Sequence, residues 1–247
     1  MKNNWFKELV ITIVQALSLV LVVHTVLVKP FSIPSPSMVP TLLVGDYLFV
    51  NKFAYGYSKY SIPFSPEIFQ GRLWGSQPER GDVIVFRPPH RDFEDWVKRV
   101  IGLPGDRIRV IEGIVTINDK PVVLENLGPY EWYDQFNKFF RDTLFTETLP
   151  NGVKHYILKG KKFGEGLADN TKEFVVPEGH LFVMGDNRDQ SHDSRFPDVG
   201  FIPQVNLVGK AEIIFFSTDL PTHNGAFWMF WRWPTATRYS RFLTLIR

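Results

Sequence analysis

Cysteine is absent from this chain of 247 residues. The absence excludes a disulfide framework, a thiolate zinc site and a cysteine nucleophile at once. It also removes the residue whose usage most often indicates an oxidising compartment, so the cellular location must be inferred from other features. A cysteine protease is therefore excluded before any motif is considered.

A surplus of charge of either sign is lacking as well. The sequence holds 28 basic and 26 acidic residues, a formal net charge of +2, and no block of Lys and Arg stands out. Because proteins that track phosphates concentrate positive charge on one surface, nucleic acid is a poor candidate partner. The hydrophobic fraction of 44% is typical of a packed globular protein.

Motifs of metal centres and of the common serine hydrolases are also missing. The sequence contains neither an H-E-x-x-H motif nor a G-x-S-x-G nucleophile elbow. Beyond the N-terminal segment, no long stretch repeats with the period of a helix. We therefore expect no metal and no cofactor, and a fold in which helices are a minor part.

The longest uncharged run lies near the N-terminus, from Leu9 to Val28. A helix of that length spans ~30 Å, which is the hydrocarbon thickness of a bilayer. We predict one transmembrane helix, with residues 1–29 forming a cytoplasmic N-terminus and anchor. A cleavable signal peptide and a buried core helix are the alternatives, but no A-x-A cleavage pattern follows the run. The flanking charges do not decide the orientation.

The remainder of the chain is typical of a mostly β domain. Short apolar runs rich in Val, Ile and Phe are separated by Gly, Pro and Asp at the intervals of an all-β fold. Glu112-Gly113 and Asn118-Asp119 have the composition of two-residue hairpin turns. The expected strands are Tyr47–Phe53, Val83–Phe86, Trp96–Ile101, Arg107–Ile111, Ile114–Ile117, Leu181–Met184 and Val208–Phe216.

Residues 124–172 interrupt this pattern. They are mixed, charged and aromatic, and their periodicity is weaker than that of the flanking segments. We expect them to form an inserted, less regular subdomain or cap. The β domain proper then comprises residues 30–123 and 173–247.

A stiff serine segment follows the expected anchor. In Ile33-Pro34-Ser35-Pro36-Ser37-Met38-Val39-Pro40, the prolines restrict the backbone and prevent a regular helix. A serine held on a rigid loop is well placed to act as a nucleophile. A Ser/Pro-rich juxtamembrane linker is the alternative that this segment alone leaves open.

A serine nucleophile needs a base, and histidine is the usual candidate. Among the six histidines, only His192 lies in a suggestive run, Ser191-His192-Asp193-Ser194. Adjacent residues of an extended chain point to opposite faces, so these neighbours cannot form a triad among themselves. We expect His192 to be a solvated loop residue.

Lysine is the other possible base, provided that burial lowers its pKa. Lys98 lies in an apolar run in which alternation places it on the same strand face as Trp96 and Val100. A lysine on such a face either extends its amine to water or is kept neutral by burial. Lys98 is therefore a candidate general base, with the water-exposed alternative still open.

Five segments, in this order behind one apolar run, resemble the type I signal peptidase (leader peptidase) family of bacteria. Each segment alone is suggestive, whereas the ordered set is highly specific. The resemblance covers the anchor and most of the β domain but says little about residues 124–172. The five segments are Pro34–Leu42, Gly45–Lys52, Arg80–Phe86, Lys98–Asp106 and Gly185–Arg195.

The resemblance implies a mostly β catalytic domain that carries a Ser–Lys dyad, with Ser37 as nucleophile and Lys98 as general base. It also implies that Ser191 orients Lys98 through a hydrogen bond. Asp193 and Arg195 resemble the ion pair that shapes the loop around this serine.

The oxyanion formed during catalysis would, by the same resemblance, be held by the backbone N–H of Ser37 and the hydroxyl of Ser35. Pro36 departs from the family, many of whose members carry glycine or another small residue there. Proline removes its own N–H but leaves the amide of Ser37 available, so the oxyanion site is retained.

The implied activity is that of a membrane-bound serine endopeptidase that removes N-terminal signal peptides from exported preproteins and cuts after small residues. An extended substrate would add to the domain as a further β-strand. The pocket that excludes large side chains is expected from Ile33, Pro34, Leu42, Trp96 and Val97.

The implied location is the inner (cytoplasmic) membrane, single-pass, with the catalytic domain on the extracytoplasmic side. The implied partners are signal peptides and the lipid bilayer, with the protein translocation machinery as a further candidate. Aromatic residues of the segment 227–233, together with Phe53, Tyr55 and Tyr57, are expected either at the lipid interface or in ordinary packing.

Two other functions are alternatives to this one. A self-cleaving Ser–Lys regulator would carry a DNA-binding helical domain where this chain has its expected anchor. A membrane-tethered β scaffold without catalysis would contain the same segments only as structural turns and strands.

Overall fold

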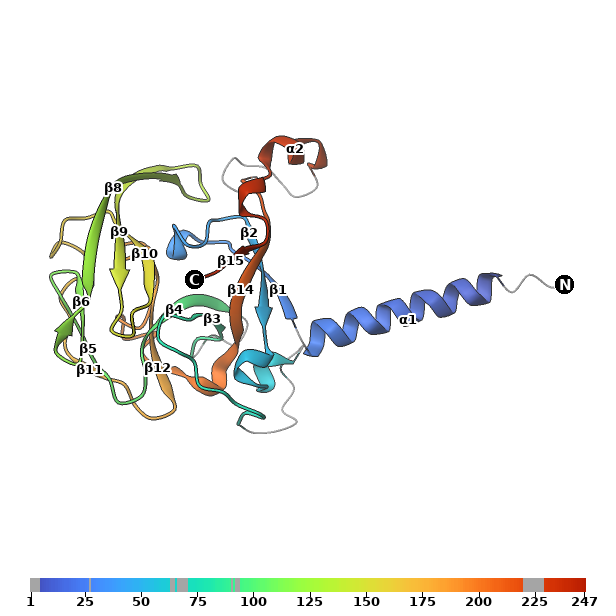
Figure 1. Cartoon of the computed structure of the whole chain (residues 1–247), viewed down its shortest axis with the longest axis horizontal. Coiled ribbons are helices and arrows are strands. Elements are labelled where there is room, and N and C mark those ends of the chain that lie inside the picture. The colour runs from blue at the N-terminus through green and yellow to red at the C-terminus, as the bar shows by residue number, and fades with distance from the viewer. Residues whose placement is uncertain are drawn as a thin grey trace.

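The computed structural model describes residues 5–26, 28–62, 65, 71–89, 91, 94–219 and 229–247. A long helix leads into a body of β-strands, and Figure 1 shows this helix projecting away from the body. The mostly β fold expected from the sequence is confirmed.

Helix α1 (Trp5–Val26) contains most of the uncharged run. Its apolar side chains Leu9, Ile13 and Leu17 are exposed, because the helix has no packing partner along this stretch in the described residues. Within the described residues, no helix combines the length and the apolarity that a membrane span requires. The side chains of residues 19–28 lie outside the described ones.

The largest sheet is antiparallel, with strand order β1-β2-β14-β3-β4-β12-β13 and β15 paired to β14. Strand β14 pairs with β2 on one side and with β3 on the other. The next strand beyond β3 is β4, whose register opposes Ile84 to Lys98. The strands are β1 (Val28–Ser32), β2 (Asp46–Asn51), β3 (Val83–Phe86), β4 (Trp96–Gly102), β12 (His180–Met184), β13 (Ile202–Pro203), β14 (Leu207–Ser217) and β15 (Thr244–Leu245).

A four-stranded sheet contains both predicted hairpin turns. Glu112, Gly113, Asn118 and Asp119 all have positive φ, as two-residue turns with the twist of a hairpin require, and both turn predictions are confirmed. All seven predicted strands are present, with ends that agree to within about two residues, as is usual for such boundaries. This sheet contains β5 (Arg107–Ile111), β6 (Ile114–Ile117), β7 (Lys120–Pro121) and β11 (Phe174–Val175).

The third sheet is formed by three long strands that the sequence did not predict. They are β8 (Val123–Tyr133), β9 (Phe139–Thr148) and β10 (Lys154–Lys159), in the order β10-β9-β8. Most residues of β8 are exposed or half-buried on both faces, so no alternating apolar pattern marks it as a strand. Residues 124–172 are therefore more regular than expected.

Short helical turns connect the strands. Among them, η1 carries the stiff serine segment. The turns are η1 (Pro36–Met38), η2 (Phe53–Tyr55), η3 (Lys59–Ser61), η4 (Gln204–Asn206), η6 (Phe230–Arg232), α2 (Trp233–Ala236) and η7 (Tyr239–Arg241).

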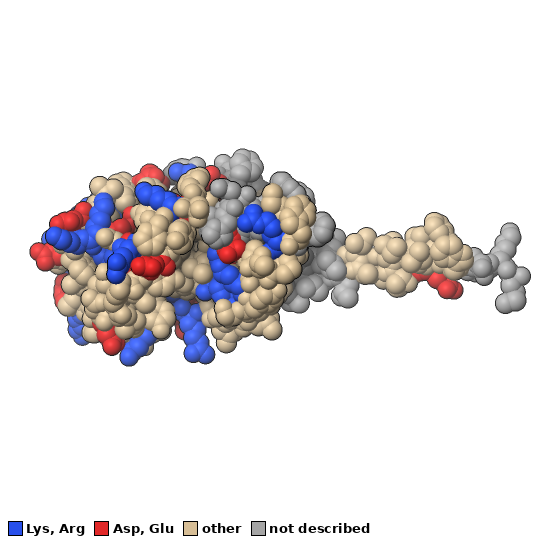
Figure 2. All heavy atoms as spheres, turned by 90° about the horizontal axis from the view of Figure 1, so that it is seen from above, with Lys and Arg blue, Asp and Glu red and all other residues tan. Residues whose placement is uncertain are grey.

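Apolar residues from the segments around η1 and from the large sheet form one core. Leu42 is fully buried there, packed with residues that include Met38, Leu48 and Val85. Burial of each such side chain stabilises the fold by about 1.5–3 kcal/mol relative to exposure. The face seen in Figure 2 shows Lys and Arg interspersed with Asp and Glu over the body, as the small net charge predicts.

The aromatic residues expected at a lipid interface fall into different environments. Tyr55 is buried, and its hydroxyl donates to Asp82 at 2.7 Å, so its packing is that of the core. Phe53 and Trp231 are exposed, each by 63%. Residues 227 and 228 lie outside the described residues.

Candidate active site

Ser37 lies at the centre of the short helical turn η1. Pro36 begins the turn and Ser35 precedes it in an extended conformation, with φ −128° and ψ 155°. Ser37 is in the first turn, so its N–H has no acceptor within the helix and is available to a ligand. Its carbonyl accepts a hydrogen bond from the N–H of Asn187 at 3.1 Å. The turn is thereby fixed on a loop distant in sequence.

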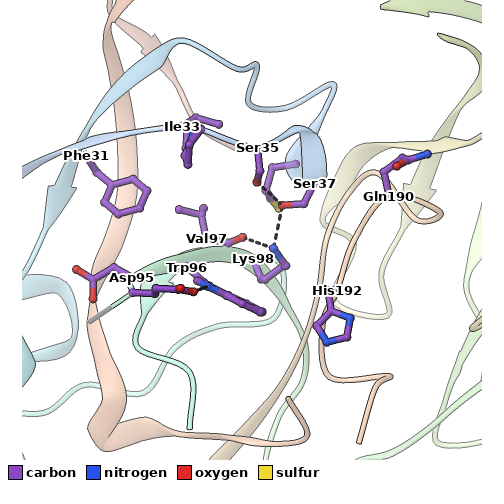
Figure 3. Close-up of a pocket in the computed structure, with 13 residues that line it drawn as sticks. Phe31, Ile33, Ser35, Ser37, Asp95, Trp96, Val97, Lys98, Gln190 and His192 are labelled. Atoms are coloured by element: carbon purple, nitrogen blue, oxygen red, sulfur yellow. Dashed lines mark hydrogen bonds between the residues drawn. The ribbon is translucent and has the colours of Figure 1, made fainter. Parts of the chain in front are cut away.

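Lys98 projects from β4 directly toward this serine. Its Nζ lies 2.9 Å from Ser37 Oγ and donates to the Val97 carbonyl at 3.0 Å. Figure 3 shows the two side chains pointing at each other across the end of a cleft. Lys98 is 4% exposed, so its amine does not extend into water. The water-exposed alternative left open by the sequence is thus wrong.

Burial lowers the pKa of Lys98 from its ordinary value to about 8. The carboxylates of Asp193 and Asp186 oppose the change, and the guanidinium of Arg195 adds to it. The loss of hydration is the larger effect, because a buried ammonium cannot be solvated as in water. A large fraction of Lys98 is therefore a neutral amine at mildly alkaline pH, and a neutral amine can accept a proton.

The loop after β12 supplies the next layer of the site. Arg195 and Asp193 form a bidentate ion pair, in which Nε and Nη2 of Arg195 each lie 2.8 Å from an oxygen of the Asp193 carboxylate. Ser191 differs from expectation, because its hydroxyl donates to Asp193 at 2.7 Å and is not bonded to Lys98 in the described structure. An ionised carboxylate is the stronger acceptor, which accounts for the choice. Ser191 is therefore bonded to a carboxylate whose charge acts on the pKa of Lys98.

Glycine is required where this loop meets Ser37. A Cβ built on Gly185 would lie 2.5 Å from the backbone carbonyl oxygen of Ser37 and 2.2 Å from Ser191 Oγ. Both distances are far below van der Waals contact, so a larger residue would displace the serine turn. The close approach of the loop to Ser37 therefore depends on Gly185.

A buried network beside the dyad was not identified from the sequence. Arg99, the neighbour of Lys98, makes two hydrogen bonds to the Asp186 carboxylate at 2.9 and 2.7 Å. Thr41 donates to the same carboxylate at 2.5 Å. Thr41, Arg99 and Asp186 all lie in the segments that carry the resemblance, but a list of motifs does not show which members touch. The network joins the serine segment, β4 and the loop after β12.

A cleft of about 460 Å³ opens beside the dyad. Ile33, Pro34, Trp96 and Val97, four of the five residues expected in the substrate pocket, line this cleft, and Figure 3 shows Ile33 on the wall opposite Trp96 and Val97. Leu42 does not, because it is fully buried in the core beneath η1. The further lining residues, which the sequence did not identify, are Phe31, Met38, Glu94, Asp95, Gln190 and His192.

His192 combines a loop position with a place in the cleft wall. Its side chain is 45% exposed and its Nε2 lies 2.7 Å from Asp198, as expected of a solvated loop residue. Its ring also stacks on Phe196 and meets the edge of Trp96. The residue therefore shapes one end of the cleft, although it does not contact Ser37.

The charges at the other end of the cleft are largely compensated. Asp95 accepts from Lys29 at 2.5 Å and from Arg87 at 2.8 Å, whereas Glu94 is bonded to the Trp96 indole at 3.2 Å. Among the described residues, no group of three His, Asp or Glu side chains is arranged to hold a metal ion.

Comparisons with known proteins agree with the resemblance. The profile of the family described as "Signal peptidase, peptidase S26" matches residues 6–216. The chain is 42% identical over 224 residues to Signal peptidase I of Rickettsia typhi, covering 88% of this chain and 83% of that protein. It is 43% identical over 206 residues to Signal peptidase I of Rickettsia prowazekii, covering 81% and 76%. A crystal structure of a signal peptidase I from Enterococcus faecalis aligns with 26% identity over 55% of this chain and 97% of that chain, with a TM-score of 0.32.

Replacement of Lys98 by methionine is expected to stabilise the fold near neutral pH. The pKa of about 8 in the folded chain lies below the ordinary 10.5, so burial of the protonated amine costs free energy at every pH below about 8. At roughly 1.4 kcal/mol per pKa unit, Lys98→Met should raise the free energy of unfolding by on the order of 3 kcal/mol at pH 7.

This gain should shrink as the pH rises from about 8 to 10.5, because the wild-type folded state then no longer carries the buried charge. Urea unfolding of both proteins across this pH range measures it. Lys161→Met, at an exposed lysine, is the matched control and should show no such trend. Equal stabilities of Lys98→Met and wild type at all pH values would contradict a costly buried ammonium.

Proposed function

This chain belongs to the signal peptidase I family, peptidase S26, whose members are serine endopeptidases that remove signal peptides, and on this premise we propose that Ser37 and Lys98 catalyse the cleavage as a Ser–Lys dyad. The observation that carries the proposal is the 2.9 Å contact between Lys98 Nζ and Ser37 Oγ. A base must lie within hydrogen-bond reach of the proton it removes, and this amine does.

The chemistry follows from the two groups and their surroundings. The neutral Lys98 amine takes the proton of Ser37 as Oγ attacks the scissile carbonyl carbon, which forms a tetrahedral intermediate with a negative oxygen. The resulting ammonium then gives its proton to the leaving amine as the C–N bond breaks. Water attacks the acyl ester in the same way, with Lys98 again accepting the proton and returning it to Ser37.

The negative oxygen of the intermediate is stabilised by the amide of Ser37 and the hydroxyl of Ser35. The amide is unpaired within η1, and Ser35 Oγ lies 3.4 Å from Ser37 Oγ, on the same side of the turn. Each donor of this kind contributes about 3–4 kcal/mol to transition-state stabilisation. Pro36 restricts the backbone between the two donors, so little reorganisation is needed during the reaction.

The cleft accommodates an extended peptide with small side chains near the cut. Strand β12 pairs with β4 only from Arg99 to Gly102, so the edge of residues 96–98 on that side is open to a substrate strand among the described residues. Ile33 and Val97 narrow the cleft next to Ser37. We propose that signal peptides of preproteins bind there by main-chain hydrogen bonds and that these walls reject large side chains.

We further propose that α1 anchors the enzyme in the inner membrane, with the β body on the extracytoplasmic side. The uncharged run from Leu9 to Val28 supports an anchor, as does the exposure of the apolar side chains in the described part of α1. The flanking charges do not supply the orientation, which comes from the family to which the chain belongs.

Substitution of either dyad residue should abolish cleavage of a preprotein by the detergent-solubilised full chain. We expect Ser37→Ala and Lys98→Met each to lower kcat/KM by at least about 10³-fold, because each removes one half of the proton transfer. Below pH ~7 the wild-type rate should rise about tenfold per pH unit and level off above pH ~9, as Lys98 loses its proton near pH 8.

The exposed-lysine variant Lys161→Met should cleave like wild type. Full activity of Ser37→Ala would refute the nucleophile, and full activity of Lys98→Met alone would assign the base to another group. A wild-type rate that falls steadily from pH 6 to pH 9 would also refute a lysine base.

Enlargement of the cleft should relax the preference for small residues. Ile33→Ala removes a wall beside Ser37, so the ratio of kcat/KM for a preprotein with Val before the cut to one with Ala should rise by about tenfold. Leu42→Ala should lower stability by about 2–5 kcal/mol and leave that ratio unchanged, because Leu42 is core. An equal shift in both variants would show that Ile33 does not set the preference.

The membrane orientation can be tested by adding protease to intact spheroplasts. An extracytoplasmic body should be digested by external protease, leaving a protected fragment that contains α1. Complete resistance of the chain before lysis, with digestion after lysis, would place the body in the cytoplasm and refute the proposed topology.

A further inference from the structure

The loop after β12 holds the nucleophile by its backbone. The N–H of Asn187 donates to the Ser37 carbonyl at 3.1 Å. The two neighbours of Asn187 are also fixed. Asp186 accepts two hydrogen bonds from the side chain of Arg99. The backbone carbonyl of Arg188 accepts one from the side chain of Arg195 at 2.8 Å. A shift of residues 186–188 would therefore move the carbonyl of the reactive serine.

The sheet β8–β9–β10 is bonded to the same three residues. The N–H of Leu158 in β10 donates to the Asp186 carbonyl at 2.9 Å, and the N–H of Arg188 donates to the Leu158 carbonyl at 3.0 Å. These two bonds place Asn187 in a short parallel bridge with Leu158. The sheet formed by the segment 124–172 is thus in backbone contact with the loop that holds Ser37.

Two buried side chains of this sheet reinforce the contact. Glu147 of β9 and His155 of β10 face each other across the strand pair, with His155 Nε2 at 3.2 Å from a Glu147 carboxylate oxygen. The same oxygen lies 2.6 Å from Nη2 of Arg188, and the Glu147 side chain is fully buried. The side chain of Arg188 is therefore bonded to Glu147, and its backbone N–H is bonded to Leu158.

We propose that Glu147 and His155 are positioning residues of the active site, which fix Arg188 and, through Asn187, the carbonyl of Ser37. The inference assigns a role in catalysis to the sheet of residues 124–172, and it rests on the proposed Ser37–Lys98 activity. Neither residue contacts the substrate cleft or the dyad, so both act only through the loop.

The protonation states of Glu147 and His155 are consistent with a permanent ion pair between Glu147 and Arg188. The Arg188 guanidinium and His155 hold the pKa of the Glu147 carboxyl well below its usual range, despite its burial. Burial and the nearby Arg99 lower the pKa of His155, so the imidazole stays neutral through the pH range in which Lys98 titrates. Loss of the Glu147 charge would leave a buried guanidinium uncompensated, which is far more costly than removal of a whole ion pair.

Glu147→Gln in the full chain tests the proposal, because it keeps the shape and removes the charge. We expect kcat for preprotein cleavage to fall about 10- to 100-fold with KM nearly unchanged, since a displacement of about 1 Å at a reacting group costs this much. A shift of residues 186–188 should also weaken the interaction of the Asp186 carboxylate with the Lys98 ammonium, which raises the pKa of Lys98, so the rise of rate with pH should move to lower pH.

Asp142→Asn is the matched control. Asp142 lies on the same strand, is buried and accepts from the Trp132 indole at 2.7 Å within the same sheet, and in the described structure it makes no hydrogen bond to residues 186–188. It loses the same charge and weakens the same sheet. Thermal unfolding identifies a temperature at which all variants are folded, and at that temperature Asp142→Asn should keep its kcat and its pH profile.

His155 supplies a second and milder test. His155→Gln keeps a donor toward Glu147 and should retain more kcat than His155→Phe, which cannot hydrogen-bond. If Glu147→Gln fails to fold, this ordering of the two His155 variants still decides the proposal. Equal kcat values for the two would overturn it.

The failure of this inference is distinguishable from failure of the proposed function. If wild type cleaves, Ser37→Ala does not, and Glu147→Gln matches Asp142→Asn in kcat and pH profile, the dyad stands and the positioning role is refuted. If Ser37→Ala cleaves as wild type does, the proposed function itself is refuted.

Discussion

The buried contact between the Lys98 amine and the Ser37 hydroxyl is the interaction on which the rest of the site depends. Burial lowers the pKa of Lys98 to about 8. Asp193 and Asp186 oppose this, but each carboxylate is already bonded to an arginine. Because the two ion pairs are each close to neutral, they weaken the effect of burial without cancelling it. The surroundings thus leave a useful fraction of the amine unprotonated, at a cost in stability that the core must offset.

The proposed Ser37–Lys98 dyad also explains why so many buried polar bonds surround these two residues. Ser37 sits on a single helical turn that makes few hydrogen bonds of its own, and Lys98 reaches it from a strand far along the chain. Their relative position must therefore be set by links between segments, such as the bonds of Arg99 and Thr41 to Asp186. Buried ion pairs of this kind contribute little net stability compared with apolar packing. Their value in this site lies in the geometry that they fix.

The sequence predicts the parts of this molecule whose pattern is local. Runs of apolar residues predicted strands such as β4, and the ordered segments singled out Ser37 and Lys98, which the fold brings within hydrogen-bond distance. Strand β8 could not be found because most of its residues are exposed or half-buried. Strands β9 and β10 bury polar side chains such as Asp142, Glu147 and His155, so no apolar period of two marks them either. Leu42 was misplaced because an apolar residue after the serine segment suits a cleft wall and a core equally well. The hydrogen bond from Ser191 to Asp193, in place of Lys98, depends on how the loop folds, and the residues next to Ser191 in the sequence do not specify this.

The position of the dyad along the chain bears on where cleavage takes place. Helix α1 ends at Val26, and only a short extended segment, which includes β1, separates it from Ser37. A fully extended chain spans at most ~3.6 Å per residue, so Ser37 lies no more than about 40 Å from the end of the helix. If α1 spans the bilayer as proposed, the nucleophile is tethered near the membrane surface. Signal peptides carry an apolar segment just before their cleavage site. When the apolar segment of a signal peptide lies in the membrane, the peptide bond to be cut lies at the membrane surface. The proposed anchor therefore keeps Ser37 and its cleft close to that peptide bond.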